Sequence, residues 1–185
     1  PVDCSATGQM CASGACADPN LYLTEYLEGS SNNKAVEVYN ATGADVRMSN
    51  CTVKLSMNGG SSTQSVVLTD QVLPAGGTWV VCNSGIVDPP RMTTCNQLSA
   101  NLAFNGDDAV MLICYSATVD NFGKVGTDPG SAWGTGMVST ADHTLRRKCL
   151  VSIGDRIGND AFDPATEWEG FGADSFGDLG IRTCP

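Results

Sequence analysis

Residues 21–40, LYLTEYLEGSSNNKAVEVYN, carry the clearest alternation of apolar and polar positions in the chain. Apolar side chains recur at every second position on each side of a polar turn: Leu21, Leu23 and Leu27 before it, and Val36 and Val38 after it. This period is typical of two half-buried strands in a hairpin. Glu25 falls on the apolar side with the leucines, so we expect its carboxylate to be paired with a cation, held by backbone N–H groups or protonated.

Further strands follow from the same period and from β-forming composition. They are predicted at 52–57, 65–68, 78–82, 109–114, 119–125 and 144–149. The run AVMLIC at 109–114 is continuously apolar and predicts a central strand covered on both faces, whereas the basic residues of 144–149 suit an exposed sheet edge. Residues 41–50 and 83–100 read as polar connections, the second too irregular for a strand. Short strands without intervening helices predict an all-β sandwich of antiparallel sheets.

The two ends of the chain differ from this centre. Residues 1–20 hold three cysteines among small residues without apolar period, and predict a cysteine-rich N-terminal segment beside a single domain at 21–185. From Ile153 onward the chain is rich in Asp and Gly with single aromatic residues, which predicts a long irregular wrap over the sandwich. The start at Pro1, without a signal peptide, fits a processed mature form, and no apolar run approaches the length of a membrane span.

The charge balance narrows the classes of partner. Ten Lys and Arg against twenty Asp and Glu give a formal net charge of −10. A protein that grips nucleic-acid phosphates over a broad face needs clustered cations, so we expect no nucleic acid bound by direct phosphate contacts.

Nine cysteines are far more than a reduced cytosolic β protein carries, so we expect disulfides and an extracellular or cell-surface location. A zinc knuckle requires C-x-x-C pairs with histidines nearby. The chain has no such pair and one histidine, so the sequence does not favour a zinc site. We expect a Cys82–Cys95 bond, which closes a loop, and offer Cys114–Cys149 as a second pair. The partners of the others stay open: Cys4, Cys11, Cys16, Cys51 and Cys184. Because nine is odd, one thiol is left free, modified or bonded outside the chain.

An ordered series of motifs resembles the lamin tail domain family, and most closely its secreted and cell-surface members. The motifs are EYLEGSSNNKAVEVYN (25–40), LPAGGTWVVCNSG (73–85), NLAFNGDDAVMLIC (101–114), DPGSAWGTG (128–136), HTLRRK (143–148) and DPATEWEGF (163–171). The resemblance implies an immunoglobulin-like β-sandwich, found alone or beside other extracellular domains such as nucleases and phosphatases. It implies no established catalytic residue. Nuclear lamin members use the domain for docking and assembly, but the cysteines place this chain outside a nuclear setting.

Candidate site chemistry is sparse. His143 is the one possible general base, no GxSxG or HExxH motif accompanies it, and we expect a surface residue and no catalysis. Several side chains could supply oxygen ligands to a calcium ion: the carboxylates of Asp107, Asp108, Asp155, Asp160 and Asp163, with Asn159 beside them. Asp and Asn at such places more often cap turns, so we expect no cofactor and keep calcium as the weaker alternative.

The basic cluster Arg146-Arg147-Lys148 alternates along a predicted strand, so one of its faces looks inward. We expect one guanidinium group to neutralise a buried carboxylate, Glu25 or Glu37. A phosphate or an acidic partner is the alternative. Asn40 and Asn50 begin N-x-T triplets and are glycosylation candidates in a secreted protein.

These observations favour a non-catalytic extracellular module for binding, adhesion or self-assembly with a protein partner or with further copies. Residues 1–20 would then cross to the next copy, by a covalent bond or by adding a strand to an open edge, which would produce a head-to-tail filament or a surface-layer subunit. The alternative is that these early cysteines brace their own domain. A second reading is an accessory domain from the precursor of a secreted nuclease or other hydrolase. A stand-alone enzyme lacks any supporting motif.

Overall fold

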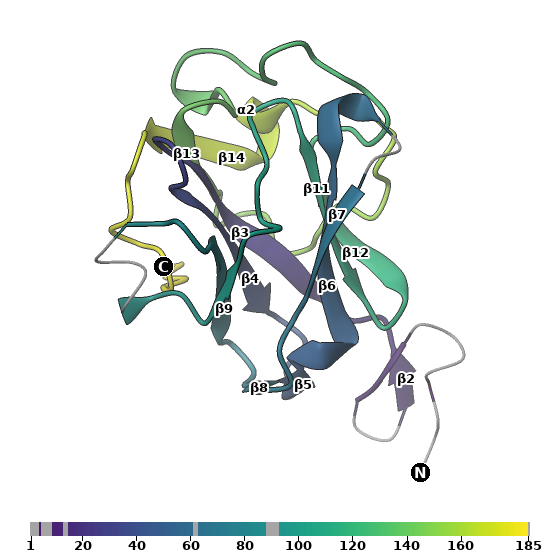
Figure 1. The fold of residues 1–185 in the computed structure, drawn as a ribbon. Helices are drawn as coiled ribbons and strands as arrows, with labels where there is room; N and C mark the ends of the chain where they lie inside the picture. The colour runs from purple at the N-terminus through teal and green to yellow at the C-terminus, as the bar shows by residue number, and fades with distance from the viewer. Residues whose placement is uncertain (1–3, 5–8, 13–14, 61–62, 88–92, 185) are drawn as a thin grey trace.

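The computed structural model describes residues 4, 9–12, 15–60, 63–87 and 93–184 (Figure 1). Two sheets face each other across one apolar core. The larger has the strand order β10-β9-β4-β3-β13-β14 and the smaller β12-β11-β6-β7. The larger comprises β3 (Leu21–Glu28), β4 (Lys34–Asn40), β9 (Thr78–Asn83), β10 (Gln97–Ser99), β13 (His143–Arg147) and β14 (Trp168–Gly172). The smaller comprises β6 (Cys51–Ser56), β7 (Thr63–Val67), β11 (Ala109–Cys114) and β12 (Ala117–Phe122).

The remaining elements are short. β1 (Met10–Ala12) pairs with β2 (Ala15–Ala17), and β5 (Val46–Arg47) pairs with β8 (Val72–Leu73). The helical turns are η2 (Met48–Asn50), η3 (Met57–Gly59), η4 (Gly136–Val138) and α2 (Pro164–Glu167). The predicted all-β, immunoglobulin-like sandwich is therefore confirmed, with every strand pair antiparallel except β10 with β9.

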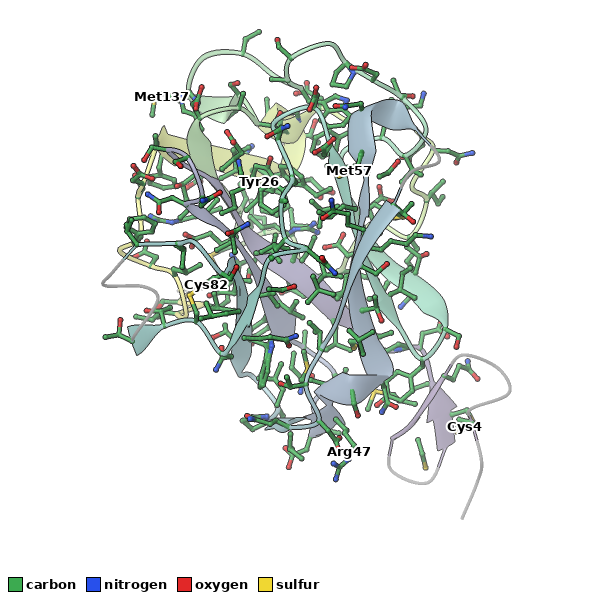
Figure 2. All side chains as sticks on the ribbon, in the orientation of Figure 1. Cys4, Tyr26, Arg47, Met57, Cys82 and Met137 are labelled. Atoms are coloured by element: carbon green, nitrogen blue, oxygen red, sulfur yellow. A yellow bond between two sulfur atoms is a disulfide. The ribbon has the colours of Figure 1, made fainter. Side chains whose placement is uncertain are left out.

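Aromatic rings fill the centre between the sheets. Tyr26, labelled in Figure 2, stacks on Phe104 and Phe122 with ring centroids 4.7 and 4.1 Å apart, and Trp168 meets Phe122 edge-on at 4.9 Å. These rings come from both sheets and from the C-terminal part of the chain. Their burial supplies a large share of the hydrophobic stabilisation.

A β-bulge in β3 reverses the faces of the first predicted strand. Leu23 lies opposite Val38 but Glu25 lies opposite Glu37, so Thr24 is the extra residue. Leu21, Leu23 and Tyr26 therefore face the main core, whereas Leu27 packs on the outer side of the sheet with Val80 and Leu179. The expectation that Glu25 shares the inner face of Leu21 and Leu23 is wrong, because a strict period of two cannot continue through a bulge.

Three other expectations about strands are corrected. β13 is no edge, because it lies between β3 and β14. Residues 83–100 contain the short strand β10, and 41–50 contain β5. β13 is interior because it pairs with β3, which lies far from it along the chain. β5 and β10 have only two and three residues, too few to show a period of two.

The C-terminal wrap is observed, although it contains α2 and β14. Its last part covers the outer face of the larger sheet, where Phe176 and Leu179 pack on the cluster of Leu27, Val80 and Ile86. A second apolar layer thus covers strands such as β9, which is buried on both faces.

Candidate functional site

A charged cleft of about 330 Å³ lies on the outer face of the larger sheet, beneath the C-terminal wrap. Arg146 of β13 lines this cleft. Its Nε donates to Glu25 at 3.3 Å, Nη1 to Asp178 at 2.7 Å and Nη2 to the Ser175 carbonyl at 3.0 Å. The guanidinium also lies 4.1 Å from the centroid of the Phe171 ring. The Arg146–Glu25 pair predicted from the sequence is present, and Arg146 fastens the wrap to the sheet.

Two carboxylates lie side by side in this cleft, because Glu25 and Glu37 are register partners on β3 and β4. Burial raises the pKa of Glu25 to about 8, against the opposing charge of Arg146. Its Oε1 has no hydrogen-bond partner among the described residues. Burial also raises the pKa of Glu37, which accepts from Thr24 Oγ1 at 2.5 Å and from the Gly180 amide at 2.6 Å. The cleft can hold a proton on Glu25 near neutral pH.

A second ion pair, which was not predicted from the sequence, links the two sheets. Arg147 and Asp120 have fully buried side chains and join β13 to β12 across the two sheets at 2.8 Å. Arg147 also lies 4.7 Å from the centroid of the Trp168 ring. Burial raises the pKa of Asp120 to about 6, while Arg147 and backbone N–H groups oppose the rise. A charged residue within the strand sequence ATVDNF of β12 was the signal available in the sequence.

Three of the five calcium candidates, Asp108, Asp155 and Asp163, accept hydrogen bonds from loop backbone amides. Asp108 is fully buried and accepts from the amides of Asn58 and Asn105, each at 2.7 Å, with Asp107 beside it. Asp163 caps α2 by accepting from Ala165 at 2.9 Å, and Asp155 accepts from the Ile157 amide at 2.8 Å. Within the described ranges no three His, Cys, Asp or Glu side chains are grouped as a metal site would need.

His143 starts β13, and its Nδ1 is 2.7 Å from the Ala141 carbonyl, which fixes the ring to the local backbone. Asn40 is corrected as a glycosylation candidate. It is fully buried, and its Nδ2, the atom that would carry the sugar, donates to three carbonyls at 2.9 to 3.1 Å. Asn50 lies exposed in η2 and stays a candidate.

Four disulfides join eight of the nine cysteines, all of which are described. They are Cys4–Cys16, Cys51–Cys114, Cys82–Cys95 and Cys149–Cys184. The Cys82–Cys95 bond is the one that the spacing predicts. The Cys114–Cys149 pair is wrong, because Cys114 lies directly opposite Cys51 on the neighbouring strand, with Cα atoms 4.1 Å apart, whereas Cys149 follows a strand of the other sheet.

The N-terminal hairpin β1–β2 projects from one end of the sandwich (lower right in Figure 1). Its base is fixed: Met10 is buried with the main core, and Asp18 pairs with Arg156 at 2.8 Å. Cys11 is exposed and free, and it lies directly opposite Cys16, a member of the Cys4–Cys16 disulfide. This arrangement places an accessible thiol beside a disulfide, the pair of groups needed for thiol–disulfide exchange.

Three of the four edge strands of the two sheets are covered, namely β14, β12 and β7. Residues 136–138 lie against Gly170 of β14, and Gly154 lies against the Val119 carbonyl of β12. On β7, the Val67 carbonyl accepts from the side chain of Gln97 at 2.9 Å, and the Ser65 carbonyl accepts from the side chain of Asn101 at 3.2 Å. These contacts block strand addition at those three edges.

The described residues include no helix with the length and apolar character needed to cross a membrane. Comparison with known families matches residues 15–126 to the model of the lamin tail domain. This range begins in the hairpin and ends after β12, and it includes more than half of the 185 residues. None of the curated proteins compared with the chain matches it.

Proposed function

The chain belongs to the lamin tail domain family, and on that premise we propose that it is a non-catalytic extracellular module that assembles through its N-terminal hairpin. The family supplies the immunoglobulin-like sandwich. Four disulfides suit an oxidising setting outside the cell. A rigid sandwich with a projecting, covalently closed hairpin is suited to linking molecules.

One observation carries the proposal: the exposed Cys11 thiol lies on a hairpin that extends away from the sandwich. The contacts at β7, β12 and β14 favour the hairpin over strand addition as the linking element. The Cys11 thiolate of one copy attacks the Cys4–Cys16 disulfide of a second copy. A new intermolecular S–S bond forms, the old one breaks, and a thiolate leaves on the second copy, so no external oxidant is consumed.

Non-reducing gel electrophoresis of the purified protein, quenched with iodoacetamide, tests the assembly. We expect dimers and longer products that collapse to one band when reduced. Cys11→Ser should remain monomeric with an unchanged melting temperature, because the side chain is exposed. A wild-type protein that stays a monomer over a wide range of concentration and of alkaline pH would refute covalent assembly through the hairpin.

A further inference from the structure

Two large apolar side chains are presented to solvent beside the Cys149–Cys184 disulfide. Leu150 is 97 % exposed and Ile153 is 57 % exposed. Both line a cleft of about 470 Å³ that lies between residues 150–155 and 160–167. A leucine that is almost wholly hydrated gains free energy when a partner covers it, so this pair marks a surface suited to contact.

The floor of this cleft is anchored to the core. Phe162 meets Phe122 edge-on with ring centroids 5.1 Å apart and Trp133 at 5.7 Å. Asn121, which is only 3 % exposed, also lines the cleft, and its Nδ2 donates to the Asp155 carbonyl at 2.8 Å. Its Oδ1 has no hydrogen-bond partner in the part of the chain that the structure describes. A preformed floor lowers the entropy lost on binding.

All the charged side chains in the described lining of the cleft are acidic. Asp155, Asp160 and Asp163 line it, and its described lining contains no Lys or Arg. Glu167 also lies there, but its negative charge is partly neutralised by Arg147 at 3.5 Å. Asp155 and Asp163 each use one oxygen to accept a backbone amide, which leaves the second oxygen for a donor. Asp160 belongs to none of the ion pairs among the described side chains.

We propose that this cleft is a docking surface for a basic peptide segment of a partner protein, with apolar side chains that cover Leu150 and Ile153 and a Lys or Arg that pairs with Asp160. Charge complementarity selects this occupant. A second copy also carries a formal net charge of −10, so it brings no net positive charge to this acidic cleft. The surface lies outside the hairpin and does not need Cys11, so it goes beyond the assembly proposed above.

The test uses the full chain, uniformly ¹⁵N-labelled, and an acetylated hexapeptide that alternates leucine with lysine. Its matched control alternates leucine with glutamate. We expect amide shift changes confined to residues 150–167 with the basic peptide, and none of them with the acidic one. The titration is repeated in Cys11→Ser, so that a failure of hairpin assembly and a failure of peptide docking are read separately.

Two exposed substitutions test the residues. Leu150→Ser and Asp160→Asn should each weaken peptide binding about threefold to tenfold while leaving the melting temperature unchanged. Ile181→Ser, at a side chain that is 61 % exposed elsewhere, and Asp45→Asn are the matched controls and should bind as wild type. Equal binding of both peptides, undiminished binding by the two cleft variants, or the same shifts from calcium chloride alone would overturn the proposal.

Discussion

Replacing Asp120 by Asn removes one charge from the fully buried pair that joins the two sheets, while preserving side-chain volume. In the wild type, Oδ1 accepts from the amides of Asn121 and Asp155 at 2.9 and 2.7 Å, and Oδ2 accepts from the Leu23 amide at 2.7 Å. Arg147 Nη2 donates to both oxygens at 3.0 and 2.8 Å. An Asn side chain has only one acceptor oxygen, and its NH₂ group would face a backbone N–H.

The cost follows from these contacts. Removing one member of a buried ion pair costs about 3–5 kcal/mol, because the partner remains as an uncompensated charge. An amide left without an acceptor costs about 1–3 kcal/mol on its own, which is part of that total. Besides residue 120, the polar partners of the Arg147 side chain among the described residues are Glu167 at 3.5 Å and the Ile153 carbonyl at 3.2 Å. We therefore expect a loss of about 4 kcal/mol, a large fraction of the ~5–15 kcal/mol that stabilises a typical domain.

Urea unfolding above neutral pH, where Asp120 is ionised, measures this loss. The matched control is Asp70→Asn, whose ion pair with Arg47 has side chains 65 % and 56 % exposed, and which should leave the urea midpoint nearly unchanged. Asp120→Asn combined with Arg147→Met should be less destabilised than the sum of the two single variants. A loss below about 1 kcal/mol for Asp120→Asn, or strict additivity in the double variant, would refute the reasoning.

Two further predictions concern the outer face of the larger sheet. Burial raises the pKa of Glu25 to about 8 from a usual value of 4.5, so the folded state retains a proton that the unfolded state releases. Wild-type stability should fall as the pH rises between these two values, and Glu25→Gln should flatten that part of the profile; parallel unfolding profiles for the two proteins would contradict this. Replacing Cys82 and Cys95 together by Ala should cost about 3 kcal/mol, because the bond closes a loop of 13 residues, and an unchanged urea midpoint would argue against that value.

β3 and β13 illustrate what the sequence pattern could and could not predict. Alternation located both strands, and the basic cluster led to the Arg146–Glu25 contact that the structure contains. The same alternation placed Glu25 on the wrong face, because a bulge at Thr24 depends on the pairing of β3 with β4 and leaves no mark in the period. The partner of Arg147 was missed because Asp120 lies 27 residues earlier, on a strand of the opposite sheet.

By itself, the sequence determined the all-β class, the expectation of disulfides and the family, because period, cysteine number and ordered motifs are local or additive properties. Only the tertiary structure decided which strands are neighbours. That choice sets the Cys51–Cys114 bond, the buried Arg147–Asp120 pair, the inaccessible Asn40 and the free Cys11. Each of these features depends on two segments that pair in one register, and burial and hydrogen bonding over the whole chain determine that pairing.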